Sequence, residues 1–275
     1  MGGTYTLSAL PEGGSTGTFS FQLVSDGLTD WVAPAATPFV LEDVISATLP
    51  EGGQHSWGVS VAEGTRVYTD LLAGVNDMYW RLLDPVGTEV WSSEARYTNT
   101  QNGPARTLAA GDYIVQLDGV AGDYSFQTRV VTNKTHAMTV GDSHADVFAG
   151  PGEVHSVAIT VPSDQRVYFN LTTGGQSLYW TLLDPVGQPV WNNIRARYPD
   201  GDDRGPMTLK AGDYTLVLNP DHDTVPDYAF EVVGLTDLTD TFSLGEDVAG
   251  ATTIPGQKLT YTFEVPEDTR VYFDC

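Results

Sequence analysis

The chain has a single cysteine, at its last position, and only 13 lysine and arginine residues against 36 aspartate and glutamate residues. One cysteine cannot form an intrachain disulfide. The net charge of −23 argues against a nucleic-acid partner, whose phosphates attract positive charge, and it disfavours anionic membrane surfaces as well. Solubility on an extracellular surface is the simplest explanation of this acidity.

Long apolar runs and helical periodicity are also scarce. No stretch is apolar enough to span a bilayer, so we expect no membrane insertion, and the start Met-Gly-Gly lacks the features of a signal peptide. Short alternating runs of Val, Thr, Tyr and Phe instead stand between clusters of Gly, Pro, Asp and Asn. This pattern predicts an all-β chain of antiparallel sandwiches with no significant helix.

A long segment recurs along the chain. RVYTDLLAGVNDMYWRLLDPVGTEVW at Arg66 returns at Arg166 as RVYFNLTTGGQSLYWTLLDPVGQPVW and begins again at Arg270. The spacing is about 100 residues, which suits an independent domain. We therefore predict two complete sandwich repeats and two incomplete ones, namely the C-terminal part of a repeat at 1–30, complete repeats at 31–132 and 133–234, and the N-terminal part of a repeat at 235–275.

The incomplete repeats have two explanations. The favoured one is that the sequence is a segment of a longer polypeptide. In the other, the half repeats of separate chains complete one another and build a filament. Two such halves would still lack the stretch equivalent to Leu72 through Ala110, which argues against this second explanation.

The DPVG element predicts a particular hairpin. Asp84 at position i, Pro85 at i+1 and Gly87 at i+3 suit a type I turn followed by a bulge, in which Gly87 adopts a left-handed conformation. Asp84 then pairs with Thr88, and Gly187 takes the same role in the next repeat. A two-residue loop is the alternative, but an ordinary type I turn splays such a hairpin.

The bulged form fixes the neighbouring register. Leu82 faces Val90, Trp80 points into the core, and Trp91 leans to the opposite face. Pro189 in the returning strand of the second repeat predicts an edge strand, because proline cannot donate to a ladder. Residues 113–117 and 124–128 are interpreted as the last hairpin of each unit.

The order of these landmarks resembles the bacterial pre-peptidase C-terminal domain family. The likeness rests on four phrases, 242–245 (FSLG), 182–187 (LLDPVG), 208–214 (TLKAGDY) and 227–230 (DYAF). It implies compact jelly-roll-like β-sandwiches that occur behind secreted proteases or as tandem repeats of large bacterial surface proteins. Some relatives resemble binders of collagen or polysaccharide with calcium. The absence of a catalytic domain makes the surface proteins the nearer analogy.

Motifs for catalysis are missing. There is no G-x-S-x-G elbow, glycine-rich phosphate loop or CxxC, so we expect no enzymatic activity. The histidines form no HExxH motif and are interpreted as solvated, with no counterpart in the first repeat for two of them, His144 and His155. The five are His55, His136, His144, His155 and His222.

Two kinds of ligand site are considered. Asp200, Asp202 and Asp203 offer oxygen ligands for Ca²⁺, yet the corresponding segment 98–102 has no carboxylate, so the repeat does not encode this site. Trp91 and Trp191 are candidates for binding sugars if they project outward. Packing against a neighbouring strand or repeat is the favoured interpretation of both tryptophans.

Short connections such as 132–136 predict semi-rigid contacts between neighbouring repeats. The sequence therefore favours a non-catalytic stalk, spacer or filament segment of a large, adhesin-like protein outside the cell or on the bacterial cell surface. Its expected partners are the neighbouring repeats and other copies of the chain. The alternative is a set of accessory modules that bind polysaccharide or a matrix protein within a secreted protein, such as a hydrolase.

Overall fold

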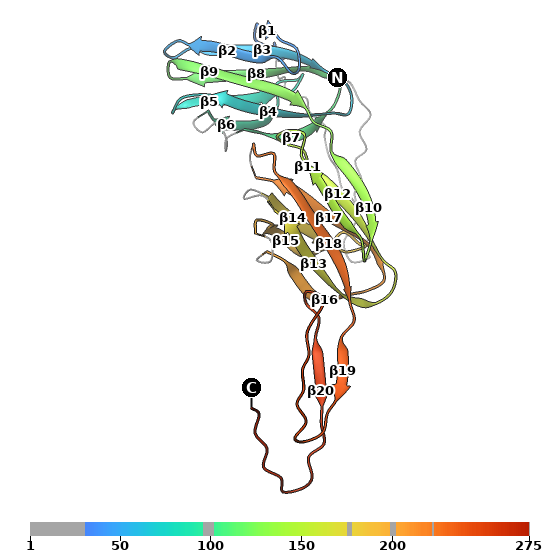
Figure 1. Cartoon of the computed structure of the whole chain (residues 1–275). Coiled ribbons are helices and arrows are strands. Elements are labelled where there is room, and N and C mark those ends of the chain that lie inside the picture. The colour runs from blue at the N-terminus through green and yellow to red at the C-terminus, as the bar shows by residue number, and fades with distance from the viewer. Residues whose placement is uncertain (1–30, 96–101, 175–177, 199–201, 222, 275) are drawn as a thin grey trace, which may run out of the picture. The chain divides into compact units, whose positions relative to one another are not determined.

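Figure 1 shows the computed structural model of the chain, which describes residues 31–95, 102–174, 178–198, 202–221 and 223–274. Every regular element in these residues is a β-strand, which confirms the prediction of an all-β chain without helix. No helix in this part of the chain could therefore cross a membrane. The predicted partial repeat at 1–30 lies outside the described residues.

The chain divides into two compact units whose main boundary lies between Arg129 and Val130. We call strands β1–β9 the first module. Its strands are β1 (Thr37–Pro38), β2 (Val44–Leu49), β3 (Gln54–Val61), β4 (Thr65–Ala73), β5 (Met78–Leu83), β6 (Glu89–Glu94), β7 (Gly103–Leu108), β8 (Gly111–Gly119) and β9 (Gly122–Val130).

Strands β10–β18 form the second module, and two short strands follow it. Their bounds are β10 (Lys134–Thr139), β11 (Ser143–Val147), β12 (His155–Val161), β13 (Gln165–Thr173), β14 (Leu178–Leu183), β15 (Pro189–Arg195), β16 (Arg204–Leu209), β17 (Gly212–Pro220), β18 (Asp227–Leu235), β19 (Leu238–Thr241) and β20 (Leu259–Thr262).

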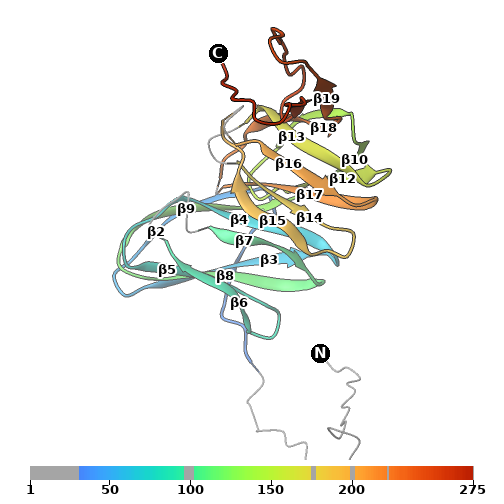
Figure 2. The same ribbon diagram turned by 90° about the horizontal axis from the view of Figure 1, so that it is seen from below.

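Each module contains a five-stranded and a four-stranded sheet. The first module has the orders β1-β3-β8-β5-β6 and β2-β9-β4-β7, and the second has β10-β12-β17-β14-β15 and β11-β18-β13-β16. The two modules thus share one strand order. Figure 2 shows the two sheets of a module as separate layers.

The core of the second module lies between its two sheets. Alternating side chains of β12, β14 and β17 face those of β13 and β18, and Trp180 is fully buried among them. In the first module Trp80 is also fully buried, and its ring centroid lies 6.3 Å from that of Phe126. The prediction that Trp80 belongs to the core is confirmed.

The prediction of purely antiparallel sheets is wrong at one edge. β1 and β10 each pair in parallel with the next strand of their sheet, β3 and β12, and β19 pairs in parallel with β20. The reason is the path of the chain. Between β10 and β12 it passes through β11 in the other sheet, so it reverses twice and returns in its original direction.

The predicted last hairpin is also wrong. β8 and β9 follow one another in the chain, but β8 lies in the five-stranded sheet and β9 in the four-stranded sheet. β9 buries an alternating set of side chains and β8 buries the unbroken run 113–117, so each strand supplies part of the core from its own sheet. Gly119, with φ of +121°, turns the chain between the two layers.

The turn of the DPVG hairpin has the predicted geometry. The Asp84 amide donates to the Thr88 carbonyl at 2.9 Å, and the Gly87 amide donates to the Asp84 carbonyl at 3.0 Å. Gly87 has φ of +85° and Gly187 has φ of +82°, so both adopt the expected left-handed conformation. The Asp84 carboxylate accepts from the amides of Val86 and Thr88, which fastens the turn.

Beyond the turn, the predicted register is wrong by one residue. Leu83 pairs with Glu89 and Leu82 pairs with Trp91, so a second bulge removes Val90 from the ladder. Trp91 therefore shares the core face with Trp80, and the two ring centroids are 4.8 Å apart. The second module repeats this pairing, and Pro189 lies on the predicted edge strand, β15.

Candidate functional site

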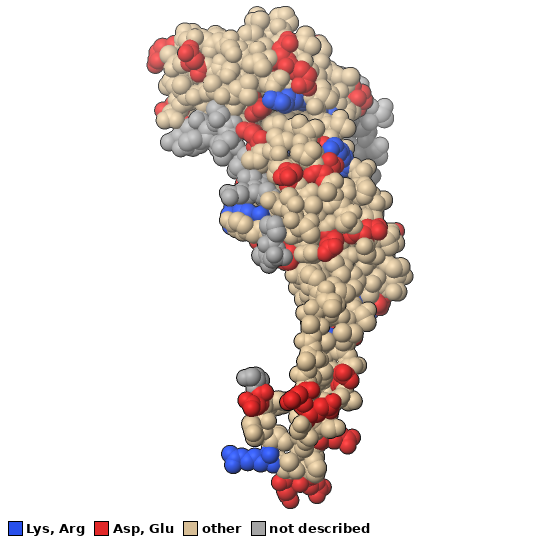
Figure 3. All heavy atoms as spheres, viewed as in Figure 1, with Lys and Arg blue, Asp and Glu red and all other residues tan. Residues whose placement is uncertain are grey.

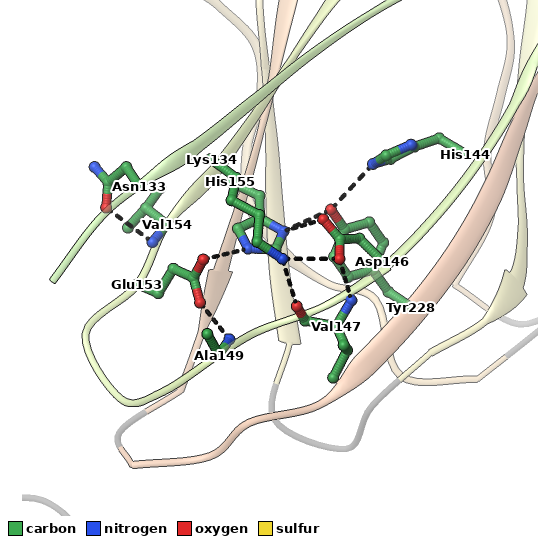
Figure 4. Close-up of polar contacts among 10 residues, drawn as sticks. All are labelled: Asn133, Lys134, His144, Asp146, Val147, Ala149, Glu153, Val154, His155 and Tyr228. Atoms are coloured by element: carbon green, nitrogen blue, oxygen red, sulfur yellow. Dashed lines mark hydrogen bonds and ion pairs between the residues drawn. The ribbon is translucent and has the colours of Figure 1, made fainter.

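The second module contains a group of polar side chains that converge from four strands and one loop (Figure 4). We call this group the histidine cluster. Its members come from β10, β11, the loop before β12, β12 itself and β18, and they are Lys134, His136, His144, Asp146, Glu153, His155 and Tyr228.

His155 lies at the centre of the histidine cluster. Its side chain is 2% exposed and its ring stacks on Phe148 with a centroid separation of 4.0 Å. Nδ1 lies 2.8 Å from the Tyr228 hydroxyl, which joins β12 to β18 in the other sheet. Nε2 lies 3.0 Å from Oε1 of Glu153, close enough for an ion pair although the contact lacks hydrogen-bond geometry.

Glu153 holds the loop that leads into β12. Its side chain is 4% exposed, and Oε2 accepts a hydrogen bond from the backbone amide of Ala149. The Asn133 side chain closes the same loop by accepting from the Val154 amide at 3.1 Å. A buried carboxylate needs such partners, so the loop and the His155 ring stabilise it together.

Asp146 connects the strands on the open side of the cluster. Lys134 Nζ lies 2.9 Å from its Oδ1 and donates to the Val147 carbonyl at 3.0 Å. His155 Nδ1 lies 3.7 Å from Oδ2. Burial raises the pKa of Asp146, but the hydrogen bonds from Lys134 and the Val147 amide outweigh it, so the pKa is lower than usual.

The remaining histidines lie at the rim of the same cluster. The rings of His136 and His144 stack with centroids 4.0 Å apart and an interplanar angle of 17°. His144 Nε2 is 3.4 Å from the Tyr228 hydroxyl. Burial, followed by the nearby His136, lowers the pKa of His144. Burial and the charges of Asp146 and Glu153 raise the pKa of Tyr228.

All members of the histidine cluster except Glu153 line a small pocket of about 180 Å³, together with Thr135, Ser156 and Val157. Its walls carry acidic, basic and neutral groups that are already bonded to one another. Three histidines and two carboxylates make proton uptake and release the chemistry that this arrangement supports most directly.

The prediction that His155 is solvated and lacks a counterpart in the first repeat is wrong. His155 is buried rather than solvated, and His55 is its counterpart, since His55 pairs with Leu117 of β8 and His155 with Leu218 of β17. His55 Nδ1 contacts the hydroxyl of Tyr124 at 2.7 Å, as His155 contacts Tyr228. The signal was present in the sequence, because these histidines have the same spacing as Arg66 and Arg166.

The proposed calcium ligands do not share one arrangement. Asp200 lies outside the described residues. Asp202 Oδ2 accepts from the amides of Arg197 and Tyr198 at 2.8 and 2.9 Å. Asp203 accepts from the Leu171 amide and the Tyr168 hydroxyl, both at 2.7 Å. In the part of the chain that the structure describes, no three His, Cys, Asp or Glu side chains are grouped to hold a metal ion.

The proposed sugar-binding tryptophans both face the core. Trp91 is 8% exposed and packs against Trp80, so the expectation that it leans to the outer face is corrected by the second bulge. Trp191 is partly buried, with its ring centroid 4.8 Å from that of Phe169. This packing is the arrangement that the sequence analysis favoured over outward projection.

Comparison with solved structures returns distant likenesses. One is the pre-peptidase C-terminal domain of a collagenase from Bacillus anthracis, with 15% identity, a TM-score of 0.32, and coverage of 36% of this chain and 98% of that chain. Another is the CUB1-EGF-CUB2 domain of human MASP-1/3, with 8% identity, a TM-score of 0.27, and coverage of 70% and 99%.

A third likeness is the full extracellular region of zebrafish Gpr126/Adgrg6, with 12% identity, a TM-score of 0.23, and coverage of 72% of this chain and 37% of that chain. No protein-family model and no curated protein matches the sequence. These likenesses are too distant to place the chain in a family.

Proposed function

We propose that this chain is a non-catalytic structural segment of a large extracellular bacterial surface protein, in which jelly-roll-like modules act as a stalk, spacer or filament. The observation that carries the proposal is the shared strand order of the two modules around filled cores. The large aromatic side chains at the centre of each core, Trp80 and Trp180, recur at the same place and are fully buried. Repetition therefore preserves stability rather than a reactive centre.

The polar groups support the same function. Asp202 and Asp203 hold backbone amides of their own loop and of β13, and the members of the histidine cluster bond to one another. Figure 3 shows carboxylates spread over the visible face and basic groups at few places. Such a surface favours solubility and repels anionic partners, including nucleic acid.

Single-molecule pulling on the whole chain tests the mechanical role. Each module should unfold as one cooperative event that releases roughly 300 Å of chain, given about 3.4 Å per extended residue. Two separate events of similar length support independent structural modules. One merged event, or gradual extension without a force peak, would contradict the proposal. Hydrolysis of peptide or glycan substrates by the purified chain would contradict its non-catalytic part.

A binding module for polysaccharide or matrix protein is the second candidate, and it rests on Tyr79. This tyrosine is 48% exposed on β5, and Tyr179 takes the same place on β14, where Arg195 lies over its ring. Exposed aromatic rings suit stacking on sugars. Glycan-array binding by the chain that weakens in Tyr79→Ala would favour this function, whereas binding unchanged by the substitution would remove its basis.

A further inference from the structure

A pair of histidines closes one edge of the second module. β10 is the edge strand of the five-stranded sheet and β11 is the edge strand of the four-stranded sheet. His136 on β10 and His144 on β11 stack face to face with ring centroids 4.0 Å apart. Their contact therefore bridges two strands that no backbone ladder joins. We call this contact the histidine seam.

The first module lacks the histidine seam. His136 pairs with Val157 as Thr37 pairs with Trp57, and His144 pairs with Phe230 as Ile45 pairs with Phe126. Thr37 and Ile45 therefore occupy the corresponding positions. Neither of these side chains titrates, so the first module provides an internal comparison within the same chain.

The charged and titratable groups around the seam come from four strands. Lys134 lies on β10, Asp146 on β11, His155 on β12 and Tyr228 on β18. Asp146 is the carboxylate in this set, and it already pairs with Lys134 at 2.9 Å and lies 3.7 Å from His155. Glu153, on the far side of His155, contacts that ring and the Ala149 amide.

Asp146 is already paired with Lys134, so its carboxylate only partly offsets a positive charge on the seam. Two cationic rings stacked at this distance would repel each other, and Lys134 adds a third positive charge nearby. We propose that the histidine seam is an acid-sensitive closure of the second module, which separates β10 from β11 on protonation while the first module stays closed. This inference does not depend on the proposed structural role.

The direction of the pH effect follows from His144. Its pKa is below the ordinary value of 6.5 in the folded chain, because burial and His136 disfavour the charged ring. The open form therefore binds a proton more readily than the closed form. The contribution of neutral His144 to the free energy of the closed form is complete above pH 6.5. It is lost as the pH falls through the lowered pKa of this histidine. Asp146 stays ionised in this window because its own pKa is lowered as well.

Hydrogen exchange of the full chain, read by mass spectrometry, tests this inference. After correction for the intrinsic exchange rate, we expect the protection of residues 134–147 to fall about tenfold between roughly pH 7.5 and 5.5. A change of about this size follows if the open form binds one proton that the closed form does not bind. Residues 37–49 should change less than about twofold. An equal change in both segments, unchanged protection of 134–147, or increased protection at acid pH would overturn the proposal.

Two sets of variants separate the seam from its surroundings. His136→Gln with His144→Gln should retain the protection of 134–147 at neutral pH and lose its acid dependence. If that double variant does not fold, the single change at exposed His136 should reduce the acid dependence, because it removes one of the two stacked rings. Thr37→His with Ile45→His should introduce acid dependence into 37–49. Persistence of the acid-induced loss in the glutamine variants would overturn the proposal.

Discussion

The two modules share their strand order but differ in the polar chemistry at one corresponding place. In the first module, the Tyr124 hydroxyl contacts His55 Nδ1 and accepts from Trp57 Nε1, both at 2.7 Å. In the second module, the Tyr228 hydroxyl contacts His155 at 2.8 Å, and carboxylates and a lysine surround that ring. One fold therefore accommodates a trio of aromatic and histidine side chains in one module and a cluster with carboxylates and a lysine in the other.

This difference separates what the fold requires from what one module has added. The tyrosine–histidine contact ties the four-stranded sheet to the five-stranded sheet in both modules. The charges are specific to the second module. Asp146 faces Tyr228 in the ladder where Ala47 faces Tyr124. The tyrosine–histidine pair is thus part of both modules, while Lys134, Asp146 and Glu153 surround it in the second.

The largest expected effect tests whether the two cores are equivalent. Trp80→Ala and Trp180→Ala should each cost about 3 to 5 kcal/mol, because both side chains are fully buried and leave a large cavity. Each substitution should lower the unfolding transition of its own module in calorimetry of the whole chain. Val186→Ala, at an 80% exposed turn position, serves as the control and should change little.

If each substitution lowers the unfolding temperature of its own module and leaves that of the other module unchanged, the two cores are separate. If Trp80→Ala lowered the stability of both modules equally, the comparison between modules as independent units would fail.

Substitution of Tyr228 and Tyr124 should have different effects on the stability of the two modules. Tyr228→Phe removes a hydroxyl that contacts His155, whose side chain is 2% exposed, so the ring nitrogen cannot find water. We expect a loss of about 2 kcal/mol there and about 1 kcal/mol for Tyr124→Phe, because His55 is only partly buried. Urea denaturation of both variants measures the two losses. Equal losses would show that the added charges leave the tyrosine contact unaffected.

The two turn glycines provide a closely matched pair. Alanine at Gly187 meets open space but must adopt φ near +82°, so Gly187→Ala should cost about 1 kcal/mol. Gly87 has the same conformation, yet an added Cβ would lie 2.4 Å from the Trp31 ring. Gly87→Ala should therefore cost more in thermal unfolding. An equal cost for both would mean that Trp31 moves aside freely.

The smallest expected effect concerns Lys134. Its pair with Asp146 is partly exposed, with side-chain exposures of 42% and 27%, so Lys134→Met should cost at most about 1 kcal/mol at neutral pH. The lysine lowers the pKa of Asp146, whose stabilising contribution is present above pH 3.8 and lost as the pH falls through the lowered value. The variant should lose stability at a higher pH during acid titration.

Ala35→Met in the first module is the matched control, since Ala35 lies two residues before Thr37 as Lys134 lies two residues before His136. Its acid titration should match that of the unmodified chain. An unchanged acid titration of Lys134→Met would contradict the role of this pair.

Much of the local structure could be predicted from sequence. The left-handed glycines of the DPVG turns and the burial of Trp80 follow from a few neighbouring residues. The face of the sheet on which Trp91 lies could not be predicted in the same way. The bulge at Val90 adds one residue, which moves every later side chain of the strand to the opposite face. The burial of His155 depends on Tyr228, which lies far along the chain and in the other sheet.

The sequence by itself determined that this protein is all-β, that its DPVG turns are bulged, and that Trp80 is buried, because alternation and turn chemistry act over a few residues. Only the tertiary structure decided that β8 and β9 lie in different sheets, that β10 pairs in parallel with β12, and that three histidines meet two carboxylates. These outcomes depend on pairing between distant strands, which no short stretch of sequence specifies.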